Sequence, residues 1–272
     1  MTLDGLFNLS DKTAIVTGGA GLLGQEFSSA LISAGANVVI ADLESELARK
    51  AASALDPSGA KVLPVGVDIR LPAAVQELVA EALGVFGKID ILVNSAAIDP
   101  KFEPTHDEMH TSSFEDYPLD LWNDALSVNL TGMFLVTQAA VKPMVESGHG
   151  VIINICSTYG LVGPDQRIYM KEGEPTRYKP VYYSVTKAAV LGFTRYLASY
   201  YAGKNIRVNA LSPGGVYNHH DEEFVQRYST RTILGRMAQK DEMNGALLFL
   251  ASDASSYMTG ANLIVDGGWT AW

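Results

Sequence analysis

The chain has 272 residues, of which 47% are hydrophobic and 25 are glycine, and it contains a single cysteine. Its 30 acidic and 20 basic residues give a formal net charge of −10. The hydrophobic fraction excludes a disordered chain, and a single cysteine excludes both a disulfide scaffold and a four-cysteine zinc site. The acidic surplus argues against binding to nucleic acids or anionic membranes, which attract clustered Lys and Arg.

Short apolar runs alternate with longer helical patterns along the whole chain. The runs predict strands at 12–17, 37–41, 61–67, 89–93, 150–155, 206–210 and 262–265. The patterns between them predict helices at 22–34, 44–55, 72–86, 119–145, 181–201 and 240–250. Continuously apolar strands are typical of a parallel sheet that is covered on both sides. We therefore predict a single α/β domain over 1–272, a Rossmann-type doubly wound parallel sheet of about seven strands with helices on both faces.

Three segments are predicted to be substrate-shaping loops, at about 99–118, 163–180 and 216–232. Loops that leave the carboxyl ends of strands line the ligand crevice of an open α/β sheet. The segment 163–180 carries four basic and three acidic residues within an acidic chain. Its cations could bind a carboxylate, a phosphate or sugar hydroxyls, or the segment could be a solvated lid without ligand contact.

No targeting or membrane segment is recognisable in the sequence. Residues 1–11 lack a basic stretch followed by an apolar one, and no apolar run approaches the roughly 18 residues of a membrane helix. We expect a cytoplasmic protein.

A glycine-rich stretch, TGGAGLLG at 17–24, lies between the first predicted strand and the first predicted helix. Gly18 and Gly21 permit a tight turn close to a pyrophosphate, and the helix that begins at Leu22 and Leu23 presents free N–H groups to it. Asp42, at the end of the second strand, is placed to accept a hydrogen bond from a ribose 2′-hydroxyl and to repel a 2′-phosphate. This pattern predicts dinucleotide binding and favours NAD over NADP, although Asp42 could instead be a helix N-cap.

Tyr183 and Lys187 are four residues apart and would lie on one helix face. A neighbouring cation stabilises a phenolate and lowers the pKa of tyrosine, so that the phenol can act as a general acid and base. Ser157 follows a predicted strand, and Asn129 lies in the preceding long helix. The four residues are our candidate catalytic set.

The order of these motifs resembles the classical short-chain dehydrogenase/reductase superfamily over essentially the whole chain. Further matching pieces are Asp68-Ile69, Asn94-Ser95-Ala96-Ala97, Ser212-Pro213-Gly214-Gly215 and Thr259-Gly260 with Asp266-Gly267-Gly268. The part after Ser212 is also similar to reductases associated with flagellin glycosylation and nonulosonic-acid biosynthesis.

The resemblance implies an oxidoreductase that transfers a hydride between NAD(H) and a secondary alcohol or ketone, and the polar insertion makes a sugar-like substrate our first choice. In this family Tyr183 would be the acid–base, Ser157 would bind the substrate oxygen, Lys187 would hold the nicotinamide ribose, and Asn129 would hold a water for proton relay. The cofactor NAD would be bound by Gly18, Gly21, Leu22, Leu23, Asp42, Asp68, Ile69, Asn94, Ala96, Tyr183, Lys187, Pro213, Gly214 and Val216. A homotetramer or homodimer through the helices at 119–145 and 181–201 is implied, and no metal is expected.

Three departures from the family pattern stand out. The glycine loop reads TGxxGxxG rather than TGxxxGxG, with Leu22 where glycine is usual, and Asn94-Ser95-Ala96-Ala97 replaces Asn-Asn-Ala-Gly. Tyr183 follows Ser157 by 26 positions, and the surplus length is the segment 163–180.

Two other functions stay open at this stage. One is a 3-oxoacyl-thioester reductase of the acyl-carrier-protein type that uses NADPH, against which Asp42 and the polar insertion argue. The other is a non-catalytic dinucleotide-binding regulator, which has no need of Ser157, Tyr183 and Lys187.

Three further features are weighed and set aside. His106 and His110 lack the glutamate that the metalloprotease pattern needs directly after its first histidine. His219 and His220 could contact a substrate, and Cys156 is interpreted as a buried structural side chain.

Overall fold

Seven parallel strands form the centre of the molecule, in the order β3-β2-β1-β4-β5-β6-β7. The computed structural model describes residues 2–99, 112–170 and 177–272. The strands are β1 (Thr13–Thr17), β2 (Asn37–Asp42), β3 (Val62–Gly66), β4 (Ile91–Asn94), β5 (Gly150–Ile155), β6 (Ile206–Pro213) and β7 (Asn262–Val265). The predicted doubly wound parallel sheet is confirmed.

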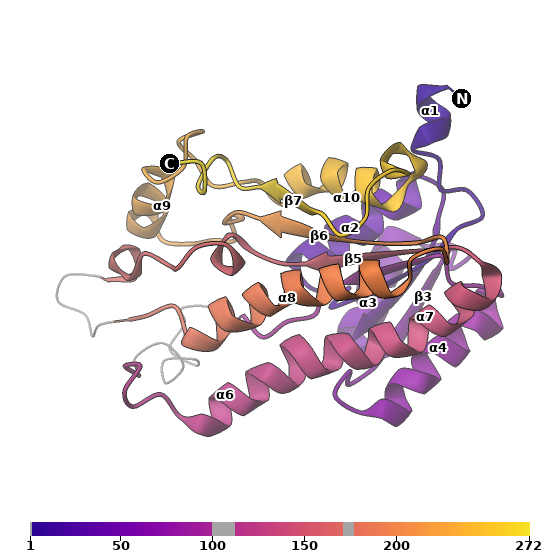
Figure 1. Cartoon of the computed structure of the whole chain (residues 1–272), viewed down its shortest axis with the longest axis horizontal. Helices are drawn as coiled ribbons and strands as arrows, with labels where there is room; N and C mark the ends of the chain where they lie inside the picture. The colour runs from indigo at the N-terminus through magenta and orange to yellow at the C-terminus, as the bar shows by residue number, and fades with distance from the viewer. Residues whose placement is uncertain (1, 100–111, 171–176) are drawn as a thin grey trace.

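Helices cover both faces of this sheet (Figure 1). One face packs against α2 (Leu22–Ser33), α3 (Ser45–Leu55) and α10 (Asn244–Ala251). The other packs against α4 (Pro72–Phe86), α7 (Met133–Ser147) and α8 (Val181–Tyr200). Within β2, Val38 and Ile40 belong to the first core, and Val39 and Ala41 belong to the second. Both faces are buried, which is why the strand runs are apolar at every position rather than at alternate ones.

The helix predicted at 119–145 is a helical path of three parts. It consists of α6 (Leu119–Leu126), a π-helical segment (Ser127–Gly132) and α7. Single π turns inside α-helices are frequent at functional sites. This π segment contains Asn129, so the irregular turn lies at one of the predicted site residues.

The loop predicted at 216–232 contains a helix, α9 (Glu222–Ser229), which corrects that prediction. Asp221 caps it by accepting a hydrogen bond from the backbone N–H of Phe224 at 2.9 Å, and Glu222 and Glu223 occupy its first turn. These are ordinary helix-start signals that the sequence carries. A second short helix, α1 (Leu3–Leu6), precedes β1. Among the described helices, none has the length and apolarity needed to cross a membrane.

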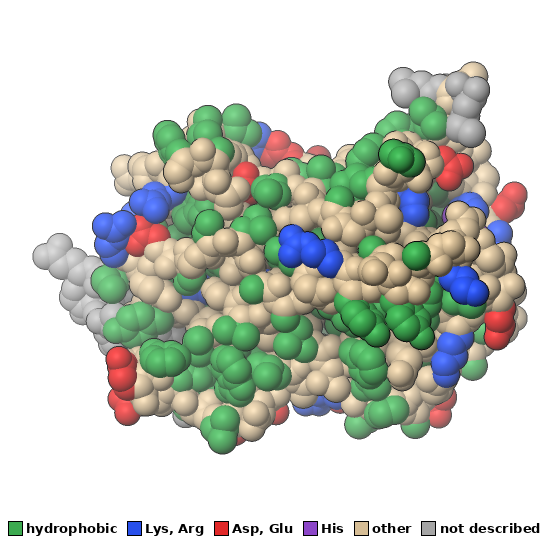
Figure 2. Space-filling model, viewed as in Figure 1, with side chains coloured by type: hydrophobic (Ala, Val, Ile, Leu, Met, Phe, Trp, Pro, Cys, Tyr) green, Lys and Arg blue, Asp and Glu red, His purple; other side chains and the backbone are tan. Residues whose placement is uncertain are grey.

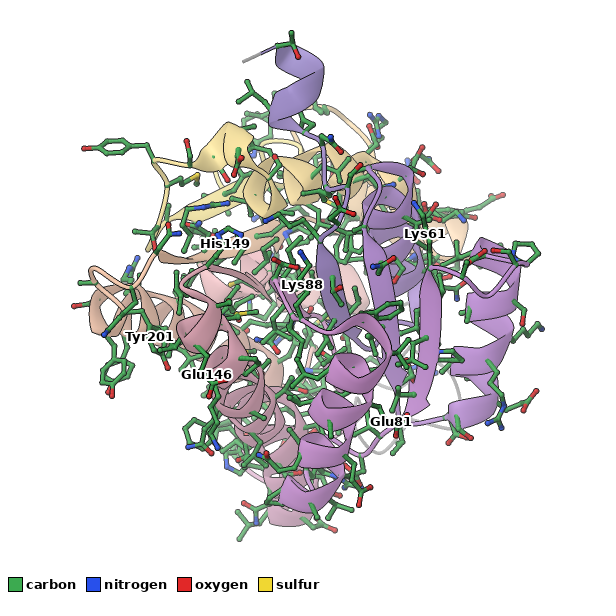
Figure 3. The ribbon with its side chains drawn as sticks, turned by 90° about the vertical axis from the view of Figure 1, so that its right-hand side faces the viewer. Lys61, Glu81, Lys88, Glu146, His149 and Tyr201 are labelled. Carbon is green, nitrogen blue, oxygen red and sulfur yellow. The ribbon has the colours of Figure 1, made fainter. Side chains whose placement is uncertain are left out.

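The end of the molecule at which the strands begin is shown in Figure 3, where the labelled Lys61, Lys88 and His149 precede β3, β4 and β5. Asp90 forms ion pairs with Lys12 and Lys88 there, both at 3.6 Å. The carboxyl ends of the strands, where an open α/β sheet binds its ligands, lie at the opposite end.

Candidate active site

A cleft of about 990 Å³ opens at the carboxyl ends of the strands. It extends across the ends of β3 to β6 and includes the loops after β1 and β4, between which the chain connections leave the sheet in opposite directions. Most of the predicted site residues line it, namely Gly18, Gly21, Leu22, Leu23, Asp42, Asp68, Ile69, Ala96, Ser157, Tyr183, Lys187, Pro213, Gly214 and Val216. Asn94 and Asn129 are buried and are not part of this lining.

At two of its glycines, Gly18 and Gly24, the glycine-rich loop is packed too closely for any side chain. Gly18 has φ +64°, and a Cβ on it would lie 2.8 Å from the Cα of Ala96. A Cβ on Gly24 would lie 2.1 Å from the carbonyl oxygen of Gly18. Gly21 is the N-cap of α2, so the first N–H groups of that helix face the cleft end of the loop. This bare, amide-rich turn fits a pyrophosphate, and the departure at Leu22 leaves the turn intact.

Asp42 and Asp68 stand at the ends of β2 and β3 beside this loop. Oδ2 of Asp42 accepts a hydrogen bond from the backbone N–H of Ala20 at 3.0 Å, which ties the end of β2 to the loop. Asp68 is held by the guanidinium of Arg70, at 2.7 Å between Oδ2 and Nη2, and this hydrogen bond lowers the pKa of Asp68. The carboxylate of Asp42 is therefore fixed against the loop, and that of Asp68 is neutralised locally by Arg70.

Three of the four predicted catalytic residues, Ser157, Tyr183 and Lys187, line the cleft together. Tyr183 and Lys187 lie one turn apart near the start of α8, and Nζ of Lys187 is 5.7 Å from the centre of the Tyr183 ring. Nζ also donates a hydrogen bond to the carbonyl of Ile155 at 2.9 Å. Ser157 begins the turn after β5, where its Oγ accepts from the N–H of Tyr159 at 3.2 Å, and it also hydrogen-bonds with Tyr183.

Burial dominates the electrostatics of this pair in the protein alone. It raises the pKa of Tyr183 well above its ordinary value, and the charge of Asp99 raises it further, while the hydrogen bond with Ser157 lowers it. Burial also lowers the pKa of Lys187. The pKa of Tyr183 therefore moves in the opposite direction from the one expected from a neighbouring lysine, because desolvation of the phenolate outweighs that attraction.

Asn129 fixes the loop after β4. Its Oδ1 accepts from the N–H of Ile98 at 2.7 Å, and its Nδ2 lies 3.3 Å from the carbonyl of the same residue and 3.2 Å from Oγ1 of Thr186. The side-chain amide thus connects the π segment, the loop after β4 and α8. The water relay that the family resemblance implies for Asn129 stays a prediction.

Asn94 belongs to a buried network within the sheet. Its Nδ2 donates to Oγ1 of Thr137 at 2.9 Å and to Oδ1 of Asn154 at 2.8 Å, and Asn154 in turn donates to Oγ1 of Thr194 at 2.9 Å. The network joins β4 and β5 to α7 and α8. Asn94 therefore supports the site from within the sheet.

The inserted segment places a cation beside Tyr183, a contact that the sequence did not reveal. Nζ of Lys179 lies 4.0 Å from the centre of the Tyr183 ring and forms an ion pair with Asp99. The backbone of Lys179 is held by the side chain of Gln166, whose Oε1 accepts at 2.8 Å and whose Nε2 donates at 3.2 Å. Arg177 lines the same part of the cleft.

Aromatic side chains form the wall of the cleft beyond Tyr183. Tyr159 packs edge-on against Tyr183 at 6.4 Å between ring centres, and Tyr169 donates a hydrogen bond to the hydroxyl of Tyr159 at 2.9 Å. Tyr228 of α9 stacks on Trp269 at 4.4 Å. Tyr159, Tyr169 and Tyr228 line the cleft, and Trp269 packs on Tyr228. Because Tyr228 and Trp269 are far from the first two rings in the chain, no local sequence signal could have identified the rings as one wall.

The residues that the sequence analysis set aside fall in three places. His219 and His220 line the cleft, and His220 stacks on Phe224 at 5.0 Å. Cys156 is buried, 2% exposed, with its Sγ 3.1 Å from the carbonyl of Lys187, which fits a structural side chain. His106 and His110 lie outside the described residues. In the described ranges, no group of three or more His, Cys, Asp or Glu could hold a metal ion.

Comparison with known proteins shows similarity along the whole chain. Residues 19–270 match a family model described as enoyl-(acyl carrier protein) reductase. The chain is 37% identical over 263 residues to a 3-alpha-(or 20-beta)-hydroxysteroid dehydrogenase of Mycobacterium tuberculosis, covering 97% of this chain and 91% of that protein. It is 33% identical over 269 residues to an NAD-dependent glycerol dehydrogenase of Listeria innocua, covering 97% and 96%.

A solved structure superposes on the whole molecule as well. The gluconate 5-dehydrogenase of Burkholderia cenocepacia, in complex with NADP and tartrate, has a TM-score of 0.86 and 31% identity, and the match covers 100% of both chains.

Proposed function

The chain belongs to the short-chain dehydrogenase/reductase family and is an oxidoreductase of CH–OH groups, and we propose that it transfers a hydride between NAD(H) and a secondary alcohol or ketone of a polar, sugar-like substrate. One observation carries the proposal. Ser157 and Tyr183 line the same cleft as the bare glycine loop and Asp42, so a dinucleotide on the loop and an alcohol at the tyrosine can meet there.

The residues at the β2 end favour NAD. The carboxylate of Asp42 would accept from a ribose hydroxyl and would repel a 2′-phosphate. Arg70, the nearby cation, is engaged by Asp68. The relatives themselves differ, since the glycerol dehydrogenase is NAD-dependent and the gluconate 5-dehydrogenase structure holds NADP. Titration with NADH and NADPH, followed by fluorescence, tests the choice, and tighter binding of NADPH would contradict it.

The reaction needs three groups of this chain. When bound, the nicotinamide accepts the hydride of the alcohol or returns it to the ketone. Tyr183 takes the hydroxyl proton on oxidation and gives it back on reduction. Ser157 stabilises the charge that develops on the substrate oxygen, and removing one such donor costs about 2.7–4 kcal/mol in other enzymes. Lys187 would bind the nicotinamide ribose.

The surroundings of Tyr183 support a polar substrate. Asp99, Arg177 and Lys179 lie at this part of the cleft, and an acyl chain would have to desolvate them. This disfavours the acyl-thioester reductase, although the matching family model carries an acyl-carrier-protein description.

A hydroxysteroid is the second candidate substrate. The aromatic wall favours it, since Tyr169, Phe224 and Tyr228 offer a large apolar surface beside the tyrosine. The same rings could equally pack against the C–H face of a sugar. The two substrates are distinguished by turnover.

A screen of the wild-type protein tests the proposal. NADH formation would be followed by absorbance with polyols, sugars, sugar acids and hydroxysteroids, and ketone reduction with β-ketoacyl thioesters. We expect turnover with a polyhydroxy compound. Tyr183→Phe should lower that turnover by about 10²- to 10⁴-fold while NADH binding stays unchanged. Full activity of this variant would refute the assignment of the acid–base.

Assembly into a homotetramer or homodimer belongs to the same proposal. Figure 2 shows hydrophobic side chains gathered over α6, α7 and α8, among them the exposed Leu119, Phe134, Val185, Tyr196 and Tyr200. Apolar patches of this kind mark interaction surfaces. Light scattering on the purified protein would give the mass, and a monomer at all concentrations would contradict the proposal.

A further inference from the structure

An ion pair lies directly on the catalytic tyrosine. Lys179, at the end of the inserted segment, and Asp99, five residues after the end of β4, both line the cleft. The side chain of Lys179 is only 10% exposed, whereas that of Asp99 is 45% exposed. Nζ of Lys179 lies 4.0 Å from the ring centre of Tyr183, so the pair is next to the side chain that we propose as the acid–base.

Side-chain amides hold the backbone at or next to both partners of this ion pair. Gln166 forms hydrogen bonds with both the N–H and the carbonyl of Lys179, at 2.8 and 3.2 Å. Asn129 does the same for Ile98, the neighbour of Asp99, at 2.7 and 3.3 Å. Groups held by a supporting set of hydrogen bonds are preorganised for binding. The pair is thus positioned relative to Tyr183 before any substrate arrives.

The chemistry of the pair suits hydroxyl groups better than an added charge. An ammonium group has three donors and no acceptor, and an ionised carboxylate only accepts, so together they satisfy both roles of neighbouring hydroxyls. The pair is neutral as a whole. Two other cations at this end are also matched by carboxylates, Arg227 by Glu223 and Arg231 by Asp165 at 3.3 Å. A substrate carboxylate would face the charge of Asp99.

We infer that Lys179 and Asp99 determine specificity by binding the hydroxyl on the carbon next to the reacting one, so that vicinal diols are the preferred substrate class. The inference rests on the proposed function and makes it narrower. Lys179 donates a hydrogen bond to the neighbouring hydroxyl oxygen, and the carboxylate of Asp99 accepts a hydrogen bond from that hydroxyl. Ser157 and Tyr183 hold the oxygen that reacts.

Three small alcohols test the inference, because they share a secondary carbinol and differ beside it. Butane-2,3-diol has a neighbouring hydroxyl, butan-2-ol lacks it, and lactate has a neighbouring carboxylate. For the wild type we expect a higher kcat/KM with the diol than with butan-2-ol. In Lys179→Met and Asp99→Asn this ratio should fall about ten- to a hundredfold, through KM for the diol, as expected for hydrogen bonds to charged groups.

Folding and cofactor binding are checked with the melting temperature and NADH fluorescence of each variant. Lys240→Met, which removes a surface ion pair with Glu26, is the matched control and should leave the ratio unchanged. An equal loss with the diol and with butan-2-ol, or an unchanged ratio, would overturn the inference. So would better turnover of lactate in Asp99→Asn, since that result indicates recognition of an anion. A wild type that oxidises none of the three at saturating concentration contradicts the proposed function itself.

Discussion

The two halves of the cleft are built in different ways. In the nucleotide half, backbone packs against backbone, as at Gly18 and Ala96, and Asp42 is fixed to the loop by one N–H bond. In the substrate half, side chains make the connections: Gln166 holds the backbone of Lys179, and Lys179 pairs with Asp99, which is 80 positions away in the chain. The first arrangement leaves little room for variation and suits a constant ligand. The second can change with one insertion, so we expect this half to determine which substrate is bound.

The largest effect is expected for Gly18→Ala, which tests whether close backbone packing in the nucleotide half is needed for NADH binding. Its positive φ and the 2.8 Å approach to Ala96 leave no room for a Cβ. A Cβ there would push the loop away from Ala96 and displace the amides that we expect to hold the pyrophosphate, so NADH should bind roughly ten- to a hundredfold more weakly, or about 1.4–2.8 kcal/mol. Gly59→Ala is the control, because Gly59 has φ +67° but nothing within 4 Å of its Cβ. Equal NADH affinity in both variants would show that close packing of the loop does not matter for the nucleotide.

A smaller effect within the nucleotide half is expected from Asp42→Asn. The amide keeps an acceptor for the N–H of Ala20 but loses the charge that repels a 2′-phosphate. The ratio of the NADPH and NADH dissociation constants should fall about tenfold, as expected for one interaction of a charged group. Glu44→Gln, an exposed carboxylate two residues further on, should leave it unchanged. An unchanged ratio in Asp42→Asn would remove the argument for NAD.

In the substrate half, Gln166→Leu should raise KM for the alcohol about three- to tenfold, since it removes two hydrogen bonds of modest strength. NADH affinity should stay constant, because Gln166 lies outside the nucleotide half. The exposed Gln76→Leu on α4 controls for the change of residue type. Weaker NADH binding in Gln166→Leu would mean that the two halves are not independent.

The smallest expected effect is a shift in the pH dependence of kcat/KM in Asp99→Asn, which removes one negative charge. Burial and then Asp99 raise the pKa of Tyr183. Without that negative charge the phenolate, which is the base for oxidation, forms at lower pH, so the rising limb of kcat/KM for alcohol oxidation against pH should move to lower pH. The other groups around this ring are Lys179, Lys187, Tyr159 and Cys156, which the substitution leaves in place. Glu26→Gln is the control, and a limb that stays in place would assign it to another group.

The same difference explains which features of the molecule can be predicted from the sequence alone. The strand positions, the glycine loop and Tyr183 with Lys187 are local patterns, because neighbours in sequence form one strand, make one turn or share one helix face. Lys179 and Asp99 are 80 positions apart, and only the folded chain brings them together. Burial around Tyr183 likewise reversed the expected direction of its pKa. Asp221 is a helix-start signal for α9, yet the segment 216–232 is predicted as a loop because it follows the end of a strand.

The stack of Trp269 on Tyr228 has a practical consequence for handling the protein. Tyr228 lines the cleft and accepts a hydrogen bond from the backbone N–H of Gly215, so the wall is connected to the last residues of the chain. Trp272 is also tied in, donating from Nε1 to the carbonyl of Arg231 at 3.1 Å. An affinity tag fused after Trp272 would be attached next to these aromatic side chains, whereas the N-terminus lies at the opposite end of the molecule (Figure 1). The protein used in substrate screens should therefore carry its affinity tag at the N-terminus.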